Sequence, residues 1–150
     1  MEPAEAQLEA FLAKYLPPVA AIGRSAIRRL RLRFPGCDAL VFDNFEALAV
    51  GFAPDGKTTT MFLSVALYPR WVSLYFLQAA GLTDPDRLFG DSAAAVRQIR
   101  LSRAEDLDAA ALRELVLQAE ANAVPAVDPL RSGQLVIKSV AVRQQPRRPV

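Results

Sequence analysis

MFLSVALYPRWVSLYFLQAAGLTDPDRLFG, residues 61–90, is the stretch of sequence that decides the fold. It predicts two strands, Met61–Tyr68 and Trp71–Leu77, because both runs have the usual strand length and are rich in apolar and aromatic residues. The dipeptide Pro69-Arg70 joins them. We therefore expect a hairpin around which the remaining chain is arranged.

The two faces of this hairpin differ in character. If Tyr68 lies opposite Trp71, alternate residues of both strands point to opposite faces. One face is purely apolar and is predicted to be core, and it consists of Met61, Leu63, Val65, Leu67, Val72, Leu74 and Phe76. The other face mixes aromatic rings, hydroxyls and small residues, and it consists of Phe62, Ser64, Ala66, Tyr68, Trp71, Ser73 and Tyr75.

The mixed face is the candidate functional surface. Aromatic side chains with polar tips recur in binding surfaces, since they offer contact area at low entropic cost. The alternative that the sequence leaves open is coverage of this face by another part of the chain or by a second copy. A small molecule or a protein is therefore the expected partner, with a homodimer through this face as a further alternative.

The strand predicted at 47–53 leaves room for an aromatic side chain of a neighbouring strand, a helix or a ligand to lie against the sheet. Its larger side chains alternate with alanine and glycine, so one side leaves space against the sheet. The turn Asp43-Asn44 ends the preceding strand, predicted at 39–43, and is expected beside Ser64 or Tyr68. The predicted ligand-binding residues are Asp43, Asn44, Ser64, Tyr68, Trp71, Ser73 and Tyr75.

The rest of the chain predicts an α+β fold. Helical periodicity occurs at 2–15 and 18–34, and Ser102 with Glu105 matches a capping box before a helix that ends near Ala123. Further strands are predicted at 96–101 and 134–142. Strands joined by short turns imply a mainly antiparallel sheet of about five to six strands with helices packed on one face.

One domain accounts for the whole length. A chain of 150 residues suits a single domain, here placed at 1–142, and it buries enough surface to fold without disulfides or a structural metal. Residues 143–150 contain three arginines and two prolines and predict a basic, flexible tail.

Composition excludes several classes of function. The chain has no histidine and one cysteine, so His-based triads, zinc centres and haem sites within one chain are excluded. No catalytic residue, metal or cofactor is predicted, and an enzyme of unknown chemistry remains an alternative to a binding role. Neither a membrane-length apolar run nor a signal peptide is evident, so we expect a cytoplasmic protein.

Arginine supplies fifteen of the eighteen basic residues, and the five between 24 and 33 are Arg24, Arg28, Arg29, Arg31 and Arg33. Such a cluster can follow a nucleic-acid backbone. The net charge is only +2 and no recognition motif accompanies the cluster, so a solvated helix face is the preferred interpretation and nucleic acid is not an expected partner.

Three segments resemble a known family: VALYPRWVSLYFLQAAGLTDPDRLFG at 65–90, VRQIRL at 96–101 and LVIKSVAVRQQPRRP at 135–149. Together they resemble the YdhG-like proteins (domain of unknown function 1801), a similarity that covers most of the chain. The resemblance implies a curved antiparallel sheet in a small bacterial cytosolic protein. Some members are described as frataxin-like iron chaperones, so iron handling is the alternative function. Oxygen ligands for a hard cation would come from Asp84, Asp86 and Asp91.

Overall fold

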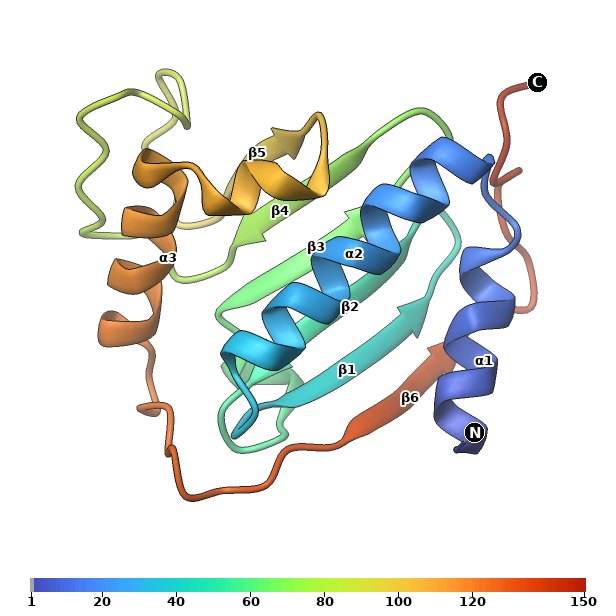
Figure 1. The fold of residues 1–150 in the computed structure, drawn as a ribbon, viewed down its shortest axis with the longest axis horizontal. Coiled ribbons are helices and arrows are strands. Elements are labelled where there is room, and N and C mark those ends of the chain that lie inside the picture. The colour runs from blue at the N-terminus through green and yellow to red at the C-terminus, as the bar shows by residue number, and fades with distance from the viewer. Residues whose placement is uncertain (1) are drawn as a thin grey trace.

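A computed structural model describes residues 2–150, which form a six-stranded sheet with helices on one of its faces (Figure 1). The helices are α1 (Pro3–Leu12), α2 (Pro17–Arg33) and α3 (Ala110–Asn122), with the short 3-10 helices η1 (Thr58–Thr60) and η2 (Ala104–Asp108). The strands are β1 (Asp38–Asp43), β2 (Leu48–Ala53), β3 (Leu63–Leu67), β4 (Val72–Phe76), β5 (Arg97–Leu101) and β6 (Leu135–Val140). The predicted α+β class is confirmed.

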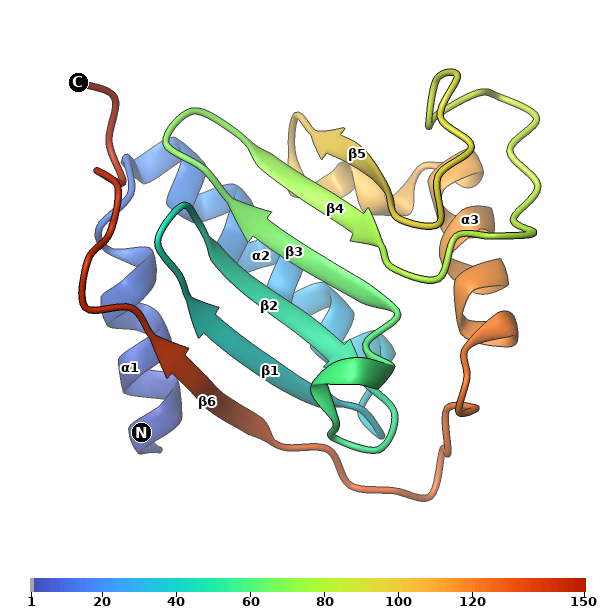
Figure 2. The same cartoon turned by 180° about the vertical axis from the view of Figure 1, so that it is seen from behind.

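The strands follow the order β5-β4-β3-β2-β1-β6 across the sheet. The first five form an antiparallel meander, whereas β6 lies beside β1 and runs parallel to it. The chain passes from α3 at one edge of the sheet to β6 at the other (Figure 2). Parallel neighbours need a long connection, and here most of the chain separates the two strands.

The register of the central hairpin matches the predicted pairing. Ala66 lies opposite Ser73 and Ser64 opposite Tyr75, and the Tyr68 N–H donates to the Trp71 carbonyl at 2.9 Å. The predicted apolar side chains from Leu63 to Phe76 on one face are fully buried beneath α2. Alternation in both strands therefore assigned this face correctly.

Met61 and Phe62 are exceptions to the predicted faces. Phe62, expected on the mixed face, is buried in the core with its ring edge-on to Phe34 at a centroid distance of 5.2 Å. Met61, expected in the core, lies over Gly51 on the mixed face, where a Cβ at Gly51 would collide with its sulfur. Leu63 is the register partner of Phe52, yet the Phe62 N–H also donates to the Phe52 carbonyl at 3.1 Å. This irregularity shifts the alternation by one residue.

The start of the third helical region also differs from the prediction. Asp106, not Glu105, accepts hydrogen bonds from the N–H groups of Ser102 (2.8 Å) and Arg103 (3.2 Å). This cap opens η2, and α3 begins only at Ala110. The predicted continuous helix is therefore two elements.

Ion pairs hold the arginines of α2 against the neighbouring helices. Arg24 pairs with Glu9 at 2.9 Å and Arg31 with Glu5 at 2.8 Å, both on α1. Two further pairs, Arg29–Asp108 and Arg33–Glu120, reach η2 and α3. Four of the five clustered arginines thus pair with other elements, and the cluster remains on the surface as predicted, since Arg24, Arg28 and Arg33 are exposed.

Leu74→Ala is expected to lower the free energy of unfolding by about 2–5 kcal/mol, because Leu74 is fully buried and its truncation leaves a cavity. Urea denaturation followed by circular dichroism measures the loss. Leu130→Ala is the matched control, since Leu130 is 92% exposed and its truncation should change stability by less than about 0.5 kcal/mol. Equal losses in the two variants would contradict the placement of Leu74 in the core.

Candidate functional site

The mixed face of the sheet is the face on which none of the three helices lies (Figure 2). It carries a pocket of about 530 Å³ over β2, β3 and β4, bounded by the β1–β2 turn. Four of the seven predicted ligand-binding residues line it: Asn44, Ser64, Tyr68 and Tyr75. The structure therefore brings together residues that the sequence predicted from three separate segments.

Small side chains create the depth of this pocket. Ala49 on β2 and Ala66 on β3 belong to its lining, as the alternation of small residues at 47–53 predicted. Gly51 does not contribute open space, because Met61 fills the volume above it. Met61 instead forms part of the apolar wall of the pocket.

Two tyrosines place their polar ends together at the pocket. The hydroxyls of Tyr68 and Tyr75 are 2.7 Å apart, and either can donate to the other. Burial raises the pKa of Tyr68, and the hydrogen bond with Tyr75 and the charge of Glu46 raise it further. Tyr68 is therefore a neutral phenol at physiological pH and acts as a hydrogen-bonding group, not as a base.

Trp71 and Ser73 lie on the predicted face but outside the pocket lining. Trp71 stacks on Tyr68 with ring centroids 5.0 Å apart, and the Arg100 guanidinium lies 4.1 Å from the Trp71 ring centroid. Ser73 is fully buried, and its hydroxyl has no hydrogen-bond partner among the described residues. Tyr68 therefore separates Trp71 from the pocket, and Ser73 is inaccessible.

Asp43 lies on the opposite side of the sheet from the pocket. Its register partner on β2 is Leu48, a core residue, and its carboxylate is fully buried between Lys14 at 2.8 Å and Arg147 at 2.9 Å. Burial raises the pKa of Asp43, but hydrogen bonds led by that from Lys14 outweigh burial, so the pKa lies below its usual value. Asp43 is thus an ionised structural carboxylate, which corrects its predicted place beside Ser64.

The segment predicted as a flexible tail packs against the domain in the structure. Besides its ion pair with Asp43, Arg147 donates to the carbonyls of Asn44 and Phe45, and only 5% of the residue is exposed. The Gln145 N–H also donates to the Phe45 carbonyl at 2.7 Å. These bonds fix the turn that carries one wall of the pocket.

Sequence reasoning missed several lining residues, chiefly Phe45, Glu46, Met61 and Leu77. Phe45 and Glu46 belong to the β1–β2 turn, which was judged only by its turn-forming residues. The sequence nevertheless contained a signal for Phe45, because an aromatic side chain in a tight turn buries little apolar surface unless it contacts another group. Met61 was missed because the alternation was extended to Met61, two residues before β3 begins at Leu63.

Three carboxylates were predicted as ligands for a hard cation. Asp84 and Asp91 instead bond within their own loop, and Asp86 faces solvent. Asp84 accepts the N–H groups of Leu88 and Phe89 at 2.9 Å each, Asp86 is exposed, and Asp91 pairs with Arg87. Across residues 2–150, no group of three or more potential metal-ligating side chains is close enough to hold an ion.

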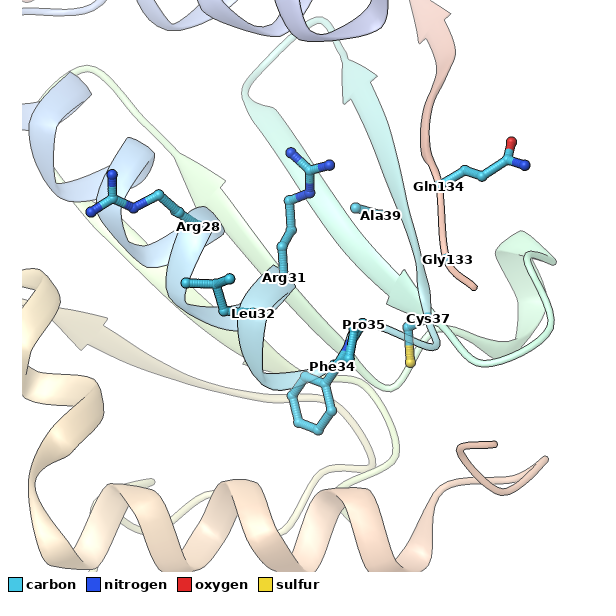
Figure 3. Close-up of a pocket in the computed structure, with 9 residues that line it drawn as sticks. All are labelled: Arg28, Arg31, Leu32, Phe34, Pro35, Cys37, Ala39, Gly133 and Gln134. Carbon is cyan, nitrogen blue, oxygen red and sulfur yellow. The ribbon is translucent and has the colours of Figure 1, made fainter. Parts of the chain in front are cut away.

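A smaller depression of about 310 Å³ lies on the helix side, between the end of α2 and the starts of β1 and β6 (Figure 3). It contains Cys37, whose pKa is raised to about 11 by burial. The thiol is therefore protonated at neutral pH and a weak nucleophile. In Figure 3 the Gln134 side chain points away from Cys37 and from Arg28, so these polar groups do not converge.

No family model, curated protein or solved structure matches this chain. Within residues 2–150, no helix has both the length and the apolar composition of a membrane span.

Arg147→Ala is expected to destabilise the domain by about 3–5 kcal/mol, because it removes one partner of a fully buried carboxylate. Urea denaturation at pH 7 gives the value. Arg143→Ala removes the same charge from an exposed position of the tail and should leave stability nearly unchanged. Similar stability of both variants would show that the tail does not stabilise the fold.

The stability gained from Arg147 should depend on pH with a defined sign. The pKa of Asp43 is lower in the folded chain than in the unfolded chain, so its ionised pairs stabilise the fold above the ordinary aspartate pKa of about 3.9. This contribution is lost as the pH falls through the folded pKa. The difference in urea midpoint between the native protein and Arg147→Ala should therefore shrink between pH 5 and pH 2. A difference that stays constant would mean that Asp43 does not carry the effect.

Proposed function

We propose that this domain is a binding module that takes a small molecule in the pocket on its helix-free sheet face. The observation that carries the proposal is the pocket itself. Its volume of about 530 Å³ is within the range usual for small-molecule sites. An apolar floor with a few convergent polar groups is also the usual composition of such sites.

A binding role is favoured over catalysis by the chemistry of the lining. The chain contains no histidine, and neither lysine nor arginine lines the pocket. Ser64 therefore has no histidine or lysine in the lining to activate its hydroxyl, and Tyr68 is held protonated. These groups can orient a ligand through hydrogen bonds, which is the role that we assign to them.

The walls of the pocket are supported from outside it. Trp71 stacks behind Tyr68, and the hydrogen bonds from Gln145 and Arg147 hold the turn that carries Phe45 and Glu46. Side chains and turns that are fixed before a ligand arrives lose less entropy on binding. The other occupant we consider is a second copy of the chain, which would cover the same face.

A screen of small aromatic and aliphatic fragments, containing cations, anions and neutral molecules, tests the proposal by two-dimensional NMR of labelled protein. Bound fragments should shift the amide signals of Ser64, Ala66 and Tyr75. Ala49→Leu should abolish these shifts by filling the pocket, whereas Ala93→Leu in an exposed loop should not. The proposal fails if no fragment perturbs these residues. Concentration-dependent dimerisation that perturbs the same residues would instead identify a second copy as the occupant.

Trp71 should report occupancy by fluorescence, because it is the single tryptophan and its ring stacks on a residue of the pocket wall. A fragment that contacts Tyr68 is expected to change the Trp71 emission in a saturable manner. The same titration with Ala49→Leu should leave the emission constant. A saturable change that persists in Ala49→Leu would place the binding site elsewhere.

A further inference from the structure

We propose that the ligand of this pocket is a small organic cation, with an apolar body and a protonated amine or quaternary ammonium group that lies beside Glu46. This inference rests on the proposed function and specifies its ligand class. The charge, the acceptor groups and the aromatic surfaces of the pocket support it independently of one another.

Glu46 is the only carboxylate in the lining, which contains no basic side chain. It belongs to the β1–β2 turn, is exposed, and forms no ion pair with any described residue. The nearby carboxylate of Asp43 is already paired, because it is buried between Lys14 and Arg147. An unpaired carboxylate at the edge of an apolar pocket attracts a cation and repels an anion.

The polar groups of the lining offer hydrogen-bond acceptors to a ligand. Ser64, Tyr68 and Tyr75 contribute hydroxyls, which both accept and donate, and the Asn44 side-chain oxygen already accepts from the Ser139 hydroxyl at 3.3 Å. The Tyr68–Tyr75 bond uses one hydroxyl proton and leaves oxygen lone pairs free. A protonated amine carries N–H donors that these oxygens can accept, whereas a quaternary ammonium group would depend on Glu46 and the aromatic rings.

Aromatic rings add a second attraction for a cation. Tyr68 and Tyr75 line the pocket, and Phe45 stands at its rim with 42% of its surface exposed. Cations are attracted to the faces of such rings, and quaternary ammonium ligands are often held in this way. The same aromatic group already holds one cation at its far side, where Arg100 lies over Trp71 and Trp71 stacks on Tyr68.

The neighbouring surface provides a contrast in charge. Beyond Tyr68 a second depression of about 410 Å³ has Arg70 and Arg148 in its lining, and it shares Glu46 and Tyr68 with the pocket. The Arg148 side chain donates to the carbonyls of Lys14 and Tyr15. An anionic ligand would be drawn to this arginine side, whereas the pocket over Ala49 offers it no positive charge. Glu46 therefore lies between a pocket without basic side chains and a depression with two arginines, and probes of opposite charge can separate the two sides.

Three probes of one shape and different charge test the inference: phenethylamine, 2-phenylethanol and 3-phenylpropionate. Affinities are measured by NMR titration and by Trp71 emission at low salt. Phenethylamine should bind at least about fivefold more tightly than phenylethanol, a factor that corresponds to one favourable cation–π or charge contact. Glu46→Gln should remove most of this advantage. Glu114→Gln, the same change at an exposed position of α3, should have no effect.

The outcomes separate this inference from the proposed function. Equal binding of the amine and the alcohol, or preference for phenylpropionate, overturns the cation while the pocket remains a binding site. An amine preference that survives Glu46→Gln also overturns it. If none of the probes or screened fragments perturbs Ser64, Ala66 and Tyr75, both the cation and the proposed function are wrong. Circular dichroism of each variant confirms that the fold is intact, as expected for an exposed turn residue.

Discussion

A single buried negative charge, the carboxylate of Asp43, constrains how the ends of this domain are arranged. A carboxylate without water must be paired and hydrogen-bonded, since the desolvation cost is several kcal/mol per ion. Lys14 supplies one partner from the end of the α1 region, and Arg147 supplies the other from the tail. Segments from both ends of the sequence are therefore held at the end of β1. The same guanidinium bonds the turn that forms a wall of the pocket.

The hydroxyl of Tyr15 has a related role on the same side of the sheet. It accepts the Leu48 N–H at 3.0 Å and donates to the Leu67 carbonyl at 2.8 Å, and these two residues are register partners on β2 and β3. The tyrosine hydroxyl thus bridges β2 and β3 at the end of their ladder. On the other face, this is the end of the sheet where Tyr68 and the β1–β2 turn enclose the pocket. On the helix side of the sheet, the Tyr15 hydroxyl bonds the ends of β2 and β3. On the other face, the same end of the sheet is open to a ligand.

Local periodicity predicted most of the fold, because strands and helices impose their own repeat on the sequence. The pairing of Ser64 with Tyr75 followed from alternation alone, and alternation placed Ser64, Tyr68 and Tyr75 on the face of the pocket but misplaced Met61. Contacts between distant segments were not predictable in this way. Nothing near Asp43 indicates that Arg147 will neutralise it, and nothing in Leu135–Val140 indicates a parallel neighbour. Glu46 was missed for a similar reason, since its position depends on how the turn folds over the sheet.

The parallel pairing of β6 with β1 has a consequence for how the chain acquires its structure. The strands β1 to β5 join neighbours in sequence, so their contacts close short loops and cost little chain entropy. Contacts of β6 and Arg147 with β1 close loops of about a hundred residues and come late in synthesis. Until residue 147 has left the ribosome, the free edge of β1 and the Asp43 charge lack their final partners. During translation this edge is therefore the part of the domain most open to pairing with another chain.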